Sequence, residues 1–155
     1  MSVFKGKERW AMVVAVLLAV LIGGCATSIK YSFDTKTRFA EQKSYAWATS
    51  SSLNQAEHLI ETNVQVLADQ LLAQKGFNKV SENADLVIKI GYGSYVYGYQ
   101  STYQLQELNL NIYKTENMEL VWRGTALGTI DTDAASDDLK QAVQGILANF
   151  PPKQK

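Results

Sequence analysis

The sequence predicts a single α+β domain, built as an antiparallel sheet of about five strands with two helices packed on one face. Three observations predict it: alternating apolar residues near position 30, a long periodic helix in the middle, and further alternating segments followed by a second helix. A chain of 155 residues suits one domain. Its 46% apolar content is ordinary for a globular protein that buries a core without disulfides or metals.

The first two strands are expected near the start of the domain. Ile29, Tyr31 and Phe33 alternate with polar residues, which is the period of a half-buried strand. A second strand candidate covers residues 43–48.

The longest helix is predicted over residues 53–75. Its apolar residues recur at steps of three and four and would share one face: Leu53, Ala56, Ile60, Val64, Leu67 and Leu71. Gly76 follows, where the end of a helix favours a residue with left-handed backbone angles.

The second half of the chain predicts more strands and a final helix. Residues 77–80 are a short strand candidate, and three longer candidates within 84–100, 108–112 and 120–130 read as an antiparallel meander. Ser136 is placed to cap a last helix, which Pro151 and Pro152 would end. The apolar face of that helix would consist of Leu139, Val143, Ile146, Leu147 and Phe150.

Residues 1–24 have the pattern of an export signal. Lys5, Lys7 and Arg9 precede an apolar run over residues 10–22, which is shorter than the roughly 20 residues that a membrane span needs. Gly23 and Gly24 then precede Cys25, the only cysteine. This junction resembles the lipobox of bacterial lipoproteins and predicts cleavage between Gly24 and Cys25, with lipid on Cys25. An ordinary secreted protein or a single-pass anchor remains an alternative.

The predicted organisation is a signal peptide at 1–24, a lipidated tether at 25–30, a domain at 31–150 and a tail at 151–155. Ala26 follows the cysteine where an aspartate would resemble an inner-membrane retention signal. In a Gram-negative cell this favours the outer membrane, with the domain facing the periplasm.

The net charge of the domain is close to zero. The chain has 15 basic and 15 acidic residues, and cleavage of the leader would remove three basic and one acidic residue, so the remainder carries a charge of about −2. Such a charge argues against nucleic-acid binding.

Several short motifs, taken in order, are similar to a bacterial lipoprotein family whose shared domain is known as domain of unknown function 4136. After the lipobox these are Tyr31-Ser32-Phe33-Asp34, Phe39, residues 43–47, Lys75-Gly76-Phe77, residues 84–87 and Val121-Trp122-Arg123-Gly124. The resemblance covers roughly residues 28–150. It implies an envelope lipoprotein with an α+β domain, and it implies no activity, cofactor or catalytic residue.

The most unusual segment is rich in glycine and tyrosine, from Gly91 to Tyr99. On an extended strand Tyr95, Tyr97 and Tyr99 would point to one face, with Gly91 and Gly93 leaving space beside the rings. Such a row suits sugar rings, a peptide strand or a partner surface, whereas the alternative is ordinary packing of aromatic residues in a sheet.

Other candidate residues favour structural roles. The acidic cluster Asp131, Asp133, Asp137 and Asp138 lacks the glycine and glutamate of a calcium loop and fits a solvated loop before a helix. His58 has no histidine or cysteine partner for zinc and is expected at the surface. Trp47 and Trp122 are expected to pack in or near the sheet, with Arg123 facing away from Trp122 as a surface charge.

These observations predict a noncatalytic lipoprotein, anchored to a membrane, that binds an envelope protein or a glycan such as peptidoglycan, or supports envelope integrity. One alternative is an accessory subunit of an envelope assembly or export complex. A less favoured alternative is an envelope hydrolase that uses the acids near residues 131–138. No cofactor or metal is expected.

Overall fold

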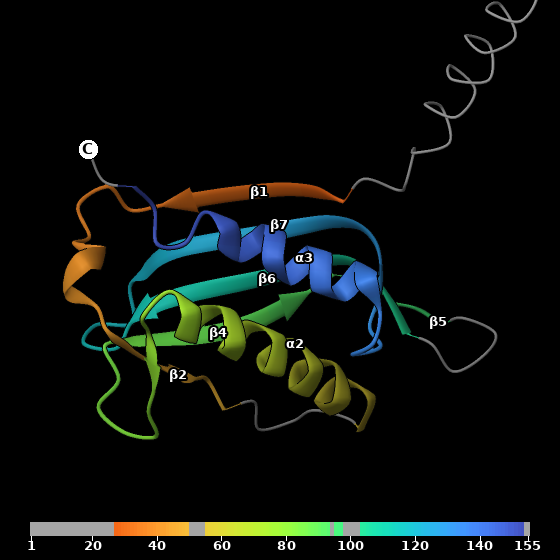
Figure 1. Ribbon diagram of the computed structural model, residues 1–155, viewed down its shortest axis with the longest axis horizontal. Coiled ribbons are helices and arrows are strands. Elements are labelled where there is room, and N and C mark those ends of the chain that lie inside the picture. Colours follow the sequence, from red (N-terminus) through yellow and green to blue (C-terminus); the bar gives the residue numbers. More distant parts are fainter. Residues whose placement is uncertain (1–26, 50–54, 94, 98–102, 154–155) are drawn as a thin grey trace, which may run out of the picture.

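The computed structural model describes residues 27–49, 55–93, 95–97 and 103–153 (Figure 1). In this part of the chain, helices α2 (Gln55–Gln74) and α3 (Asp137–Ala148) lie side by side across one face of a sheet. The predicted α+β class with two helices is therefore confirmed. Residues 1–26 and the predicted helix start at Leu53 lie outside the described residues.

Within the described residues the sheet has seven strands, where about five were predicted. They are β1 (Ser28–Phe33), β2 (Ser44–Trp47), β3 (Asn78–Lys79), β4 (Leu86–Tyr92), β5 (Tyr95–Tyr97), β6 (Tyr103–Lys114) and β7 (Leu120–Asp131). The order is β1-β7-β6-β4-β2-β3, and β5 pairs with β6 beyond the end of β4. A short 3-10 helix, η1 (Phe39–Glu41), connects β1 to β2.

The prediction of a purely antiparallel sheet is wrong. β2 runs parallel to both β3 and β4. A parallel pair needs a long crossover connection, and α2 supplies it between β2 and these two strands. Hydrophobic periodicity reveals that a strand exists but carries no information on its neighbour or direction, so the sequence pattern missed this crossover.

The meander in the second half is confirmed. β6 is central and pairs antiparallel with β4 on one side and β7 on the other. Opposed pairs such as Ile88 with Ile112 and Ile112 with Trp122 place their side chains on the face that the helices cover. These three residues are almost fully buried.

Helix α2 buries a slightly different stripe from the predicted one. Ile60 and Val64 are buried as expected, but Ala68 and Leu72 continue the stripe toward the sheet. Leu67 and Leu71 are half-buried and line a cleft of about 160 Å³ shared with α3. Gly76 ends the helix at φ +86°, and Phe77 N–H donates to the Leu72 carbonyl, which confirms the predicted C-terminal turn.

Helix α3 matches its prediction closely. The Ser136 Oγ accepts a hydrogen bond of 3.1 Å from the Asp138 N–H, as an N-cap should. Every apolar residue expected on its inner face is buried, and Phe150 is buried just beyond its end. The predicted strand at 77–80 is also present, as β3.

Strand β1 forms one edge of the sheet and pairs only with β7 among the described strands. It begins at Ser28, within the segment predicted as a tether. Within the described residues, no helix has the length and apolar character to cross a membrane.

Candidate functional site

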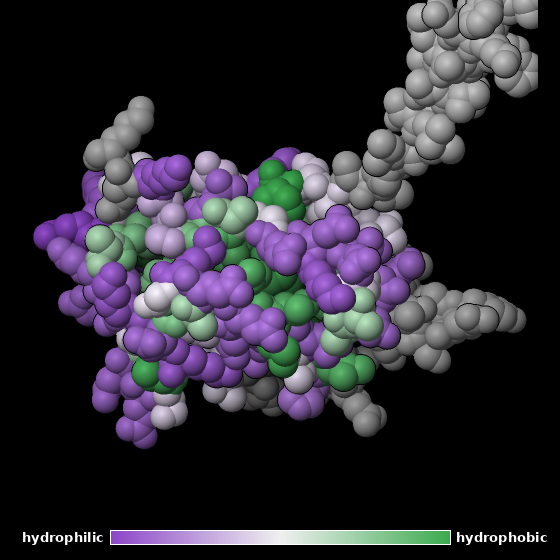
Figure 2. Space-filling model, viewed as in Figure 1, coloured by the Kyte–Doolittle hydropathy of each residue, from purple (hydrophilic) through white to green (hydrophobic). Residues whose placement is uncertain are grey.

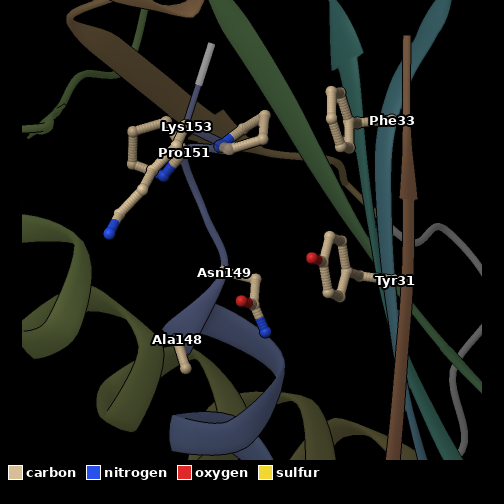
Figure 3. Close-up of a pocket in the computed structure, with 7 residues that line it drawn as sticks. Tyr31, Phe33, Ala148, Asn149, Pro151 and Lys153 are labelled. Atoms are coloured by element: carbon tan, nitrogen blue, oxygen red, sulfur yellow. The ribbon is translucent and has the colours of Figure 1, made fainter. Parts of the chain in front are cut away.

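A pocket of about 300 Å³ lies at the sheet edge, between β1 and the segment that follows α3 (Figure 3). Tyr31 and Phe33 project from β1 toward this segment. The residues that line the pocket are Tyr31, Phe33, Ala148, Asn149, Pro151, Pro152 and Lys153.

The two aromatic rings of β1 give the pocket its wall. Their ring centroids are 6.4 Å apart and their planes differ by 11°, so they are stacked side by side along the strand. Tyr31 is 49% exposed although it is large and aromatic, while Phe33 is half-buried against the core. The wall is therefore apolar and accessible, with an amide at Asn149 and a cation at Lys153 nearby.

Large side chains pack closely on β7, next to this wall. Gly124 is paired with Tyr31, and a Cβ at Gly124 would lie 2.2 Å from the Trp122 ring and 2.6 Å from Ile146. The Trp122 ring packs edge-on against Phe150, with 5.3 Å between ring centroids. Glycine at position 124 thus leaves the space that the Trp122 ring occupies.

The opposite face of the sheet, which the helices leave uncovered, carries a polar network. Arg123 Nε donates to Asn111 Oδ1 at 2.5 Å, and Thr125 Oγ1 donates to Asn109 Oδ1 at 2.6 Å. Asn109 Nδ2 in turn donates to Glu107 Oε1 at 2.8 Å. As predicted, Arg123 is a surface residue that faces away from the buried Trp122. The polar side chains on this face thus hydrogen-bond to one another.

The acidic cluster holds its own loop together. Asp131 Oδ1 accepts from the Asp133 N–H at 3.0 Å, and Asp133 Oδ1 accepts from the Ala135 N–H at 2.8 Å. Asp137 and Asp138 form the first turn of α3, where the helix dipole favours negative charge. Across the described part of the chain, no three His, Cys, Asp or Glu side chains gather closely enough to hold a metal ion.

The remaining predicted residues fall into three groups. His58 is exposed on α2, and Trp47 and Trp122 pack at the sheet, as expected. Tyr95 and Tyr97 belong to β5, and their common face remains a prediction. Gly24, Cys25 and Tyr99 lie outside the described residues.

Asp69, which was not among the predicted site residues, joins α2 to the sheet. Its Oδ1 accepts from the Tyr45 hydroxyl at 2.7 Å and from Trp47 Nε1 at 2.8 Å, and its Oδ2 contacts Lys79 Nζ at 2.9 Å. Burial and then the hydrogen bond to Asp69 raise the pKa of Tyr45. Asp69 is one of three acidic residues on this helix, with Glu57 and Glu61, and no local pattern distinguishes it from the other two.

The pocket was missed as well, because it forms between segments far apart in the sequence. The alternation of Tyr31 and Phe33 predicted a strand correctly, but only the path of residues 149–153 beside that strand creates the cavity. No local pattern specifies that path.

The fold and pocket together define a class: a two-layer α+β domain whose edge strand presents stacked aromatic rings. The model of the family DUF4136, domain of unknown function, matches residues 29–152, so this chain belongs to that family. The resemblance drawn from the short motifs is thereby confirmed. No curated protein sequence matches the chain.

Several solved structures of bacterial proteins have a similar fold. A PDZ domain protein from Parabacteroides distasonis has a TM-score of 0.60 at 15% identity; the match covers 92% of this chain but only 40% of that one. A PelC dodecamer from Paraburkholderia phytofirmans has a TM-score of 0.51 at 12% identity, over 79% of this chain and 96% of that one. A DUF4136 family protein from Bacteroides thetaiotaomicron has a TM-score of 0.50 at 12% identity, over 80% of this chain and 94% of that one. At these identities the likeness concerns the fold alone.

Proposed function

We propose that this chain is an envelope lipoprotein, held by lipid on Cys25 to the periplasmic face of the outer membrane, that binds a protein partner and performs no catalysis. The observation that carries the proposal is the junction between leader and domain. A basic, apolar and glycine-ended leader stops at Cys25, and β1 begins at Ser28. A lipid on Cys25 would therefore hold the domain close to the bilayer surface.

The pocket beside β1 supports the binding role. An edge strand offers backbone N–H and C=O groups to an added strand, and side-chain pockets next to that strand select residues of the incoming peptide. Tyr31 and Phe33 supply flat apolar surface, and aromatic residues of this kind are enriched in protein interfaces. The occupant that fits best is an extended segment of an envelope protein.

The anchor is tested by mass spectrometry of the N-terminus after growth with a palmitate analogue. The expected result is a mature chain that starts at Cys25 and carries acyl groups, whereas Cys25→Ala carries no label. A chain that is cleaved elsewhere, or is unlabelled with Cys25 in place, would contradict the proposed anchor.

The binding role is tested by photo-crosslinking in cells, with a photoreactive residue in place of Tyr31. The control probe replaces Leu59 on the outer face of α2, because it is 59% exposed, close to the 49% of Tyr31. A discrete protein adduct that forms from position 31 and not from position 59 is expected. Glycan adducts at position 31 would mean that the pocket binds a cell-wall glycan and not a protein. Identical adducts at both positions would contradict the pocket as a specific binding site.

A partner identified in this way also decides between a single envelope protein and a larger assembly. Stable co-purification of several membrane proteins with the wild-type chain, lost when Tyr31 is changed to Ser, would make the chain an accessory subunit of an envelope complex.

A further inference from the structure

We propose that β5 and the start of β6 form a second contact with the bilayer that holds the lipid anchor. These two segments, residues 95–97 and 103–105, are called the tyrosine hairpin below. The proposal rests on the proposed lipid anchor at Cys25. It assigns the tyrosines to the lipid interface, where the aromatic body and the hydroxyl of tyrosine are both accommodated.

The strand registers bring the tyrosine hairpin and the start of β1 to the same end of the sheet. Ser28 pairs with Leu127, and Leu127 pairs with Glu107. From that level β6 extends backward to Tyr103, which pairs with Tyr97. In Figure 1 the N-terminal end of β1 and strand β5 accordingly lie at the same side of the molecule.

The distances along the strands match what a common membrane plane requires. From Glu107 to Tyr103 a strand advances by about 13 Å at roughly 3.3 Å per residue, so the tyrosine hairpin projects past the level of Ser28 by about that length. The chain from Cys25 to Ser28 can span at most about 10 Å. Lipid on Cys25 would therefore hold the bilayer surface within reach of the hairpin.

The composition of this end of the β4–β6 region suits an interface. No charged residue occurs in the sequence between Lys89 and Glu107, and the described residues of this stretch include Tyr92, Tyr95, Tyr97 and Tyr103. By contrast, the far end of β6 carries Lys114 and is followed closely by Glu116 and Glu119. The uncharged, tyrosine-rich stretch thus coincides with the end where the anchor begins.

The acidic loop constrains what kind of bilayer contact this is. Asp131 pairs with Gln104 and so lies at the same end, with Asp133 next to it in the loop. These carboxylates oppose attraction to anionic lipids, so the contact depends on the aromatic residues and is shallow. Neutral phosphatidylcholine is therefore the right test surface.

The experiment measures tryptophan fluorescence of the full-length, lipidated protein in phosphatidylcholine vesicles that contain a lipid with a quencher near its headgroup. Tyr97→Trp places the probe in the hairpin, Tyr95→Trp gives a second probe, and Tyr113→Trp is the control near the far end of β6. Emission of the unsubstituted protein, which retains Trp47 and Trp122, is subtracted. Circular dichroism establishes that each variant is folded.

The expected result is that quencher lipid lowers the added emission at positions 97 and 95 about twofold or more and leaves position 113 nearly unchanged. Protein that floats with the vesicles but shows equal, weak quenching at 97, 95 and 113 would overturn the hairpin contact and leave the lipid anchor intact. If the emission at position 97 is unaffected by the quencher lipid and changes only when muropeptides are added, the tyrosines bind a glycan and the proposed bilayer contact is wrong. Protein that carries no acyl group and does not float would overturn the anchor and the hairpin contact together.

Discussion

The two ends of the sheet differ in how firmly the chain is held. At the end farthest from Ser28, called the far end, four aromatic side chains pack together. There Asp85 accepts hydrogen bonds from backbone N–H groups at the start of β2, and Asp34 accepts one within its own loop. At the end where β1 begins, called the anchor end, β5 forms only three residue pairs with a single neighbour.

The far end gains its rigidity from contacts between distant parts of the sequence. Phe39 and Phe77 each pack against Phe150, which also packs against Trp122. One cluster of rings thus joins η1, the residue before β3, strand β7 and the segment after α3. Asp85 Oδ2 accepts from the N–H groups of Lys43 and Ser44 at 2.8 and 2.9 Å, tying the start of β2 to β4. The difference indicates that the far end maintains the fold, while the anchor end is left available for contacts outside the domain.

Figure 2 shows the face of the molecule that the two helices cover. Apolar surface collects in the middle of this face, and hydrophilic residues surround it. The half-buried Leu67 and Leu71 line the cleft between the helices. The core thus reaches close to the surface between α2 and α3 and is closed by the polar side chains at its rim.

The largest effect is expected at the far end, for Trp122→Ala. Trp122 is fully buried, so its truncation should lower the free energy of unfolding by about 3–5 kcal/mol. Its Nε1 has no hydrogen-bond partner among the described residues, so Trp122→Phe should cost clearly less than the alanine variant. Urea unfolding followed by circular dichroism measures both. Equal losses of unfolding free energy for the two variants would contradict the conclusion that ring packing, and not the Nε1 group, is what Trp122 contributes.

A smaller effect is expected for Asp85→Ala, which leaves the Lys43 and Ser44 N–H groups without their acceptor. Because the carboxylate is exposed and water can replace it, the loss should be about 1–2 kcal/mol. Asp85→Asn keeps one side-chain oxygen and should lose less. Urea unfolding at pH 7 compares the two variants.

The same carboxylate makes stability depend on pH. The hydrogen bond from the Lys43 N–H is the main cause that holds the pKa of Asp85 below its usual value of 3.8, and the Thr37 hydroxyl acts likewise on the pKa of Asp34. A carboxyl whose pKa is lower in the folded than in the unfolded protein stabilises the fold. This stabilisation is fully present above the unfolded-state pKa and is lost as the pH falls through the folded-state pKa. Wild-type stability should therefore fall below about pH 4, with a shallower slope for Asp85→Ala. An unchanged slope would rule out this role for Asp85.

Sequence patterns predicted the parts of the fold that depend on local periodicity. The alternation in β4 and β6, the stripe of α3 and its Ser136 cap each follow from residues within one element. The parallel pairing of β2, the bonds of Asp69 and the pocket at Tyr31 all join segments that are remote in sequence. A single sequence shows which side of an element is apolar, but not which element will cover it.

A fourth prediction concerns the start of α3, near the anchor end. Ser136→Ala removes the oxygen that accepts from the Asp138 N–H and should cost about 1 kcal/mol. Ser136→Asp retains an acceptor at the same place and should restore most of that loss. Thermal unfolding of the three proteins at pH 7 makes the comparison, and an alanine variant as stable as the wild type would show that the cap contributes nothing.

The smallest effect on stability is expected in the tyrosine hairpin itself. β5 lies beyond the end of β4 and pairs with β6 alone, so Tyr97→Ala should change the free energy of unfolding in detergent by less than about 0.5 kcal/mol. The measurement is urea unfolding beside Trp122→Ala, with the denaturant slope compared as well. A loss of about 2 kcal/mol or more would make Tyr97 part of the core and remove the contrast between the two ends. A loss near zero, together with lipid quenching at position 97 of the Tyr97→Trp protein, would mean that this tyrosine serves the membrane contact and not the fold.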